Sequence, residues 1–175
     1  NPDYNGASQE GVGYFQRTLY NGRRVSAARA FLHPAKQRGN LDIRTRAHVV
    51  RILFDGKRAT GVQYHDGTTE RVVSARREVI LCGGAINSPQ VLQLSGIGPA
   101  AVLQEIGVPV LHELPVGENL RDHYPVRMTA HVKGTDTVNE RVRGLKLVKE
   151  VADYALRRKG VLTLSPTLVY IFWKS

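Results

Sequence analysis

Six histidines and one cysteine are the side chains best suited to metal binding or nucleophilic catalysis: His33, His48, His65, His112, His123, His131 and Cys82. No two of the histidines form an HxxxH or HExxH pair, and no cysteine cluster accompanies them. Zinc sites need ligands at such short spacings, so the sequence does not predict a metal site. The Gly-x-Ser-x-Gly turn is also missing, which leaves nucleophilic catalysis without support. Cys82 stands in an apolar run and is expected to be a small buried side chain.

A glycine turn offers the better prospect of a ligand site. The apolar run Val79–Cys82 is typical of a buried strand, and Gly83-Gly84-Ala85 then turns the chain with little side-chain bulk. A helix over Gln90–Ser95 is predicted next, with Asn87 or Ser88 as its cap and Pro89 in its first position. Glycines let the backbone approach a cofactor, and a helix N-terminus favours an anion. The pattern indicates a nucleotide site, although a tight strand-to-helix connection that binds nothing would look the same.

The elements around this turn mix strands and helices. Two Asp-Gly turns separate alternating runs, which predicts an antiparallel meander over His48–Phe54, Ala59–His65 and Thr69–Ala75. Earlier in the chain, we expect strands at Gly13–Tyr20 and Leu41–Arg46, an Asn21-Gly22 turn and a helix capped by Ser26. Later elements are a short helix at Ala100–Ile106, strands at Val108–Leu111 and Val126–Val132, an amphipathic helix at Arg143–Lys159 and an apolar strand-like tail at Leu168–Trp173.

The amino-acid composition limits which classes of protein this chain can belong to. The chain has 175 residues, 42% of them apolar and 23% charged, which is ordinary for a globular protein with one core. One cysteine permits no intrachain disulfide, which fits the cytoplasm, and no signal peptide or membrane-spanning run is visible. The net charge of +10 leaves open a non-catalytic basic module that binds nucleic acid. The basic residues are mostly scattered, and no RNA-recognition motif or zinc spacing accompanies them, so nucleic acid is not the expected partner.

Two motifs resemble a known family. Residues 84–98, GAINSPQVLQLSGIG, resemble the second signature of the glucose–methanol–choline (GMC) oxidoreductases, and residues 116–123, VGENLRDH, resemble the motif that follows it. The resemblance extends from about Asp3 to about His131 and is greatest to the bacterial choline and alcohol dehydrogenase-like branch. It implies an α+β fold with a mixed sheet. Residues 1–124 would form part of a Rossmann-like FAD-binding domain with an antiparallel meander, and residues 125–175 would begin the substrate-binding domain.

The resemblance also implies a cofactor and its contacts. FAD is the expected cofactor, with the backbone of Val49 beside the adenine and with Gly83 and Gly84 near the adenosine half. Family members often have Ala-Gly where this chain has Gly83-Gly84, a mild departure. The motif beside the flavin matches Asn119, Asp122 and His123, and His123 is expected to orient other groups rather than to act as the catalytic base. The family carries its Gly-x-Gly-x-x-Gly fingerprint and its catalytic histidine in regions that this chain does not match.

The expected function follows from this placement. The chain begins with Asn1 and stops after an apolar run, so we expect it to be a central piece of an FAD-dependent enzyme. That enzyme would oxidise a primary alcohol, choline-like in its chemistry, to an aldehyde by hydride transfer to the flavin. The piece alone is expected to be inactive. Its apolar tail, Val161–Trp173, is expected to drive self-association, because several large apolar side chains would otherwise face water.

Overall fold

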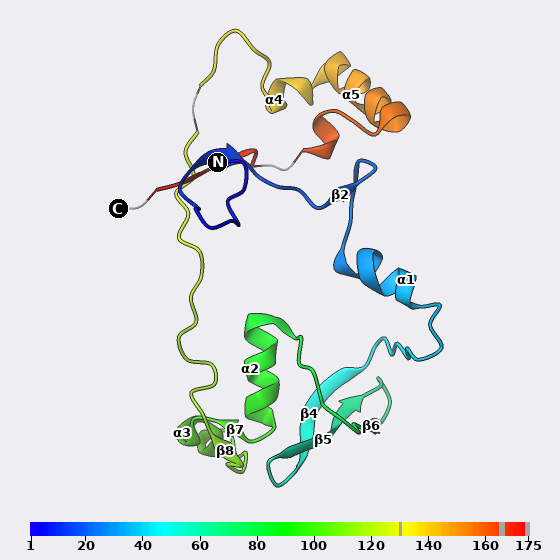
Figure 1. Ribbon diagram of the computed structural model, residues 1–175, viewed down its shortest axis with the longest axis vertical. Coiled ribbons are helices and arrows are strands. Elements are labelled where there is room, and N and C mark those ends of the chain that lie inside the picture. The colour runs from blue at the N-terminus through cyan, green and yellow to red at the C-terminus, as the bar shows by residue number, and fades with distance from the viewer. Residues whose placement is uncertain (130, 165–166, 174–175) are drawn as a thin grey trace. The chain divides into compact units, whose positions relative to one another are not determined.

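The computed structural model describes residues 1–129, 131–164 and 167–173. The chain divides into two compact units, one formed by Asn1–Leu41 with Met128–Ser175 and the other by Asp42–Arg127. Helices and strands occur in both units, as Figure 1 shows, so the expected α+β class is confirmed. Among the described residues, none of the helices has the length and apolar character needed to cross a membrane.

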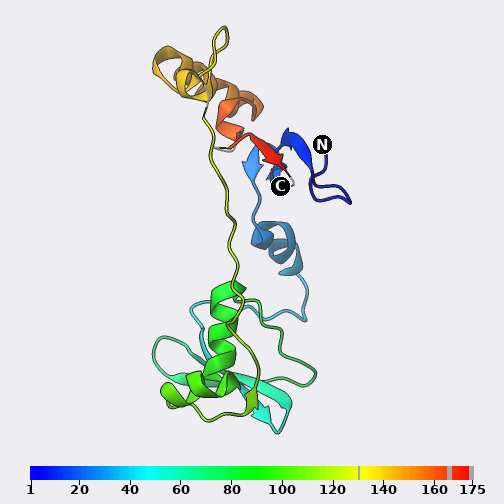
Figure 2. The ribbon, with the colours of Figure 1, turned by 90° about the vertical axis from the view of Figure 1, so that its left-hand side faces the viewer.

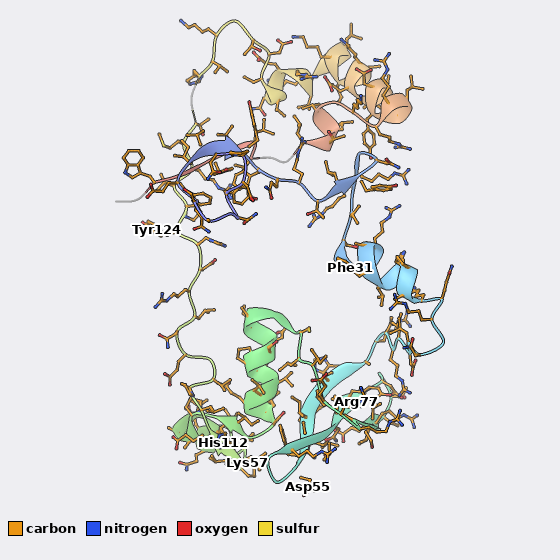
Figure 3. All side chains as sticks on the ribbon, in the orientation of Figure 1. Phe31, Asp55, Lys57, Arg77, His112 and Tyr124 are labelled. Carbon is orange, nitrogen blue, oxygen red and sulfur yellow. The ribbon has the colours of Figure 1, made fainter. Side chains whose placement is uncertain are left out.

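The unit Asp42–Arg127 contains the predicted antiparallel meander. Its strands are β4 (His48–Asp55), β5 (Arg58–His65) and β6 (Glu70–Ser74), in the order β4-β5-β6. The turns lie where the Asp-Gly pairs predict them, with φ of +55° at Gly56 and +101° at Gly67. These left-handed conformations favour glycine. Side chains of Asp55 and Lys57 project at the β4–β5 turn (Figure 3).

Two helices follow the sheet in this unit: α2 (Gly84–Leu94) and α3 (Ala100–Glu105). A short parallel pair, β7 (Ile97–Gly98) with β8 (His112–Glu113), joins the segments around α3. Helix α2 lies beside β4 (Figure 1 and Figure 2). Its end is fixed there by Ser95, whose Oγ accepts the Ile52 N–H at 2.8 Å and donates to the Val91 carbonyl. Leu103 on α3 is fully buried and lies beside Gly98 of β7.

Several predictions for this unit are wrong. Residues 79–82 are irregular, and Cys82 is exposed rather than buried. A parallel strand needs a neighbour to satisfy its backbone groups, and none of the described strands pairs with this run. Leu41–Arg46 is irregular as well, and the strand predicted at Val108–Leu111 begins only at His112. Helix α2 starts at Gly84, so Pro89 lies inside the helix instead of at its first position.

The other unit contains two small antiparallel sheets. Strand β1 (Gly11–Tyr14) pairs with β9 (Val169–Phe172), and β2 (Leu19–Tyr20) pairs with β3 (Arg23–Arg24). The β2–β3 turn is the predicted Asn21-Gly22, with φ of +49° and +66°, which is the geometry of a type I′ hairpin. Gly13–Tyr20 is therefore not one strand, because the chain leaves β1 before it enters the hairpin.

Both stretches of sequence that form this unit, residues 1–41 and 128–175, contain helices. Ser26 caps the first one, as predicted: its Oγ accepts the Arg29 N–H at 3.3 Å. The helix consists of η1 (Ala28–Leu32), which is a short π-helix, and α1 (His33–Ala35). Pro34 lies inside it, and a proline cannot donate a normal helical hydrogen bond. The later elements are α4 (Val138–Arg141), α5 (Gly144–Arg157) and the 3₁₀ turn η2 (Val161–Thr163).

Glu150 on α5 connects these later elements. Its side chain is the buried charged group of the described residues, 4% exposed. One carboxylate oxygen accepts from Arg141 Nε at 2.8 Å, and the other accepts from the Val161 N–H at 2.9 Å. A Cβ at Gly160 would come within 2.6 Å of the same carboxylate, so only glycine fits there. Glu150 thus joins α4, α5 and η2 around one charge.

Three predictions for the C-terminal part had different outcomes. Residues 126–129 and 131–132 are irregular rather than a strand, and Ala130 lies outside the described residues. The tail strand is confirmed as β9, which pairs with β1 of the same chain and buries Tyr170 among Tyr4, Phe15 and Phe172. Trp173 is 88% exposed, and Ser165, Pro166, Lys174 and Ser175 lie outside the described residues. The amphipathic helix is confirmed as α5, but its apolar face is exposed at Leu145, Val148 and Leu156.

Candidate cofactor site

The start of α2 places the two glycines in different environments. Gly83 precedes the helix with φ of −77°, and a Cβ there would meet Asn87 Cβ and the Ser88 nitrogen at 3.2 Å. Gly83 is therefore small because its own helix turn leaves no room. Gly84 has φ of +86°, and a Cβ there would have no heavy atom within 4 Å. The backbone of Gly84 is thus open to an approaching molecule, in a conformation that favours glycine.

The same helix start has the electrostatic character of an anion site. The first N–H groups of a helix have no partner within it, and the peptide dipoles give this end a partial positive charge. The first turn of α2 carries no acidic side chain that would compete for those groups. A negatively charged group could approach the helix through the open side of Gly84.

Val49 lies on β4, the strand beside α2. It pairs with Tyr64 on β5, and the register shifts between Val49 and Arg51, so Val50 is the extra residue of a β-bulge. Bulges redirect neighbouring backbone groups and occur often beside functional sites. Val49 is 36% exposed, whereas Tyr64 is buried and its hydroxyl accepts from Arg44 Nη1 at 2.7 Å. The arrangement fixes the strand and leaves Val49 at the surface.

The loop after β8 carries the remaining three predicted residues. Gln93 on α2 donates from Nε2 to the Val116 carbonyl at 2.8 Å, and a Cβ at Gly117 would lie 2.9 Å from that nitrogen. Asn119 has φ of +56°, a left-handed conformation that asparagine tolerates. The carboxylate of Asp122 accepts the His123 N–H at 2.7 Å. All three residues are exposed, as is Tyr124, which Figure 3 labels on the extended segment that follows.

The six predicted residues therefore belong to one unit and to three segments of it. Helix α2 connects these segments, because Ser95 fixes it to β4 and Gln93 holds the loop that leads to Asn119. Among the predicted residues, the described hydrogen bonds join Asp122 to His123 directly. Sequence reasoning missed the positioning roles of Gln93 and Ser95. Their roles depend on contacts with β4 and with the loop at Val116, which no pattern in the sequence indicates.

No metal site accompanies this arrangement in the part of the chain that the structure describes. There, no group of three or more histidine, cysteine, aspartate or glutamate side chains could hold a metal ion. The candidate site therefore consists of backbone groups at a glycine turn, a strand with a bulge and a polar loop.

Comparison with known proteins gives this site its context. The family model for GMC oxidoreductases matches residues 1–125. The chain is 46% identical over 160 residues to an oxygen-dependent choline dehydrogenase of Staphylococcus xylosus, covering 91% of this chain and 28% of that protein. It is 57% identical over 125 residues to an oxygen-dependent choline dehydrogenase of Yersinia pestis, covering 69% of this chain and 22% of that protein.

Solved structures agree with the sequence relatives. An FAD-dependent oxidoreductase from Chaetomium thermophilum superposes with a TM-score of 0.79 at 31% identity, covering 91% of this chain and 29% of that one. A fungal aryl-alcohol oxidase superposes with a TM-score of 0.73 at 26% identity, covering 93% and 29%. The chain thus spans less than a third of the length of these relatives. The matched motifs, the meander and the glycine turn lead to one conclusion: the chain belongs to the GMC oxidoreductase family.

Proposed function

We propose that the whole protein is an FAD-dependent oxidoreductase that oxidises a primary alcohol of the choline type to an aldehyde. The observation that carries this proposal is the 46% identity to a choline dehydrogenase, maintained over 91% of the chain. The residues of this chain would hold the cofactor, and they would not perform the acid–base chemistry. The relatives are named as choline dehydrogenases and an alcohol oxidase, which supports the enzyme over the basic module that binds nucleic acid. We assign the enzyme to the cytoplasm, in keeping with the one cysteine of this 175-residue chain.

The residues at the site fit an FAD molecule. The open backbone at Gly84 and the first N–H groups of α2 suit the adenosine half and the phosphate attached to it. Val49 offers backbone at a bulge, which suits an edge-on contact with the adenine. Asn119, Asp122 and His123 supply exposed polar groups on one loop, which suits hydrogen bonding to the flavin half. Bound FAD would supply the hydride-accepting chemistry, while these residues bind and orient it.

His123 has a positioning role in this proposal. It follows Asp122 in the loop, and the Asp122 carboxylate already holds its backbone. We assign residues 1–124 to the FAD-binding domain of the whole enzyme and residues 125–175 to the start of its substrate-binding domain. The catalytic base would come from another part of the polypeptide.

The proposal is tested on the full-length protein. Purified enzyme is expected to contain FAD and to form betaine aldehyde from choline, with slower turnover of a neutral primary alcohol of similar size. Aldehyde is measured with a redox dye present as electron acceptor, because the reduced flavin must be re-oxidised before each further turnover. A flavin-free protein, or one that turns over no primary alcohol, would contradict the proposal.

The chain of 175 residues is expected to show no alcohol dehydrogenase activity by itself. The dinucleotide fingerprint and the catalytic histidine of the family are missing from its sequence. The measurement is dye reduction by the purified chain with added FAD and choline, compared with full-length enzyme at equal molarity. Reduction above the rate of FAD alone would mean that this segment contains the catalytic groups.

We also expect the isolated chain to self-associate. Leu145, Val148, Leu156 and Trp173 are exposed apolar side chains in the unit that contains α5 and β9. Burying one such side chain contributes about 1.5–3 kcal/mol, so several together favour association. Light scattering should give a mass that rises with concentration, and Leu145→Glu with Leu156→Glu should lower it. A constant monomer mass at high concentration would exclude self-association.

A further inference from the structure

A second feature lies in the unit formed by residues 1–41 and 128–175, which holds none of the proposed flavin contacts. A cavity of about 640 Å³ opens between the β2–β3 hairpin and the end of α5. Five of its lining residues are basic: Arg23, Arg29, Arg157, Arg158 and Lys159. Its size falls within the range of about 300–1,000 Å³ that is typical of small-molecule sites.

Direct contact between two distant segments forms this cavity. Gly22, with φ of +66°, lies against the Arg158 backbone so closely that a Cβ would collide with the Arg158 carbonyl oxygen. Arg158 itself adopts a left-handed conformation with φ of +56°, and its N–H donates to the Tyr154 carbonyl at 2.9 Å. Its guanidinium carbon lies 5.1 Å from the centre of the Tyr154 ring. The hairpin turn and the helix end thus hold each other in place.

Among the described residues, no carboxylate lines the cavity beside its basic groups. None of its lining residues is acidic, and the nearest described ion pair joins Arg157 to Asp153 at 3.7 Å, with Arg157 75% exposed. An exposed pair at that distance neutralises little charge. Cations at a helix C-terminus are favourable, which accounts for Arg157, Arg158 and Lys159. It does not account for Arg23 and Arg29, which come from another part of the chain and add repulsion between like charges.

We propose that this cavity binds a small molecule that carries phosphate and at least two negative charges. Such an anion would offset the repulsion between the five basic groups. Arginine is suited to the task, because its planar guanidinium presents paired N–H donors that match two phosphate oxygens. Arg23 lines the cavity from the hairpin, and Arg157 and Arg158 line it from the end of α5, so both segments supply donors to the anion. None of the proposed flavin contacts lines this cavity, and the proposal does not depend on the proposed enzyme activity.

The probe for this site is inorganic pyrophosphate, titrated into full-length, FAD-loaded enzyme by calorimetry in buffer containing chloride at physiological ionic strength. The wild-type enzyme should bind one pyrophosphate per chain, in addition to FAD. The double variant Arg23→Gln/Arg29→Gln should weaken binding at least about tenfold, since it removes two positively charged donors from the cavity. The control is Arg143→Gln, an exposed arginine at the other end of α5, which should leave affinity unchanged.

Two outcomes would overturn the proposal. The first is absence of pyrophosphate binding by the wild-type enzyme, and a lower melting temperature of Arg23→Gln/Arg29→Gln would then mean that acidic side chains of the enzyme itself fill the cavity. The second is equal weakening of binding by the Arg143→Gln control. The flavin content of the double variant should equal that of wild type, and a fall would assign these arginines to the flavin site instead.

Discussion

Gly84→Ala is expected to weaken FAD binding by the full-length enzyme about tenfold, equivalent to about 1.4 kcal/mol. The methyl group of the alanine occupies the open space through which FAD would approach the start of α2. The alanine must also adopt φ of +86°, which costs about 1–2 kcal/mol of folding free energy for a side chain other than glycine and lowers stability rather than FAD affinity. The measurement is the dissociation constant of FAD from fluorescence titration of flavin-stripped enzyme.

Gly107→Ala is the matched control for that variant. Gly107 follows α3 in the same unit, has φ of +70°, and a Cβ there would also have no heavy atom within 4 Å. The two variants should therefore lose similar stability from backbone strain, while Gly107→Ala keeps wild-type FAD affinity. Equal FAD affinities in both variants would mean that Gly84 serves the backbone turn alone and that the cofactor does not approach it.

Glu150→Gln is expected to lower the melting temperature of the full-length enzyme by several degrees. The substitution keeps the shape of the side chain but removes the negative charge that Arg141 and the Val161 N–H surround. An arginine that has lost its buried partner is destabilising. Asp136→Asn is the control, because Asp136 and Lys146 form an exposed ion pair at 2.8 Å with half of each side chain in solvent. Exposed pairs contribute little, so that variant should melt close to wild type.

The effect of Glu150→Gln should depend on pH. The hydrogen bond from the Val161 N–H, followed by that from Arg141, lowers the pKa of the Glu150 carboxyl below its ordinary value of 4.5. A lowered pKa in the folded state means that the carboxylate stabilises the fold fully above its ordinary pKa. This contribution is lost as the pH falls through the lowered value. The melting temperatures of wild type and Glu150→Gln should therefore converge under acidic conditions, and a constant difference down to low pH would contradict the role of the charge.

Local signals in the sequence predicted much of the fold. The turns at Asp55-Gly56, Asp66-Gly67 and Asn21-Gly22 were correct, because short glycine turns determine their own backbone conformation and fix the strand pairing on either side. The amphipathic pattern of α5 was correct for a similar reason, since helical periodicity is contained within one segment. Ser26 illustrates the same point, because a cap acts on a backbone group only three residues away.

Elements that depend on distant partners were predicted poorly. Val79–Cys82 has the composition of a buried strand, but a strand forms only where another strand supplies hydrogen bonds. The exposed apolar face of α5 shows the same limit, because amphipathicity indicates that a face can be buried without naming what covers it. At the candidate site, the sequence indicated the glycine turn but not the left-handed conformation of Gly84. The roles of Ser95 and Gln93 depend on β4 and on the loop at Val116, which periodicity does not reveal.

Hydrogen exchange of the full-length enzyme with and without FAD tests the central claim most directly. The claim is that three segments separated in sequence hold one cofactor: the start of β4 at Val49, the start of α2 at Gly83 and Gly84, and the loop at residues 119–123. Backbone amides in all three segments should exchange more slowly when FAD is bound. The β1–β9 pair and α5 should exchange at the same rate in both states. Unchanged exchange at residues 83–88 on FAD binding would contradict the assignment of the cofactor site to this glycine turn.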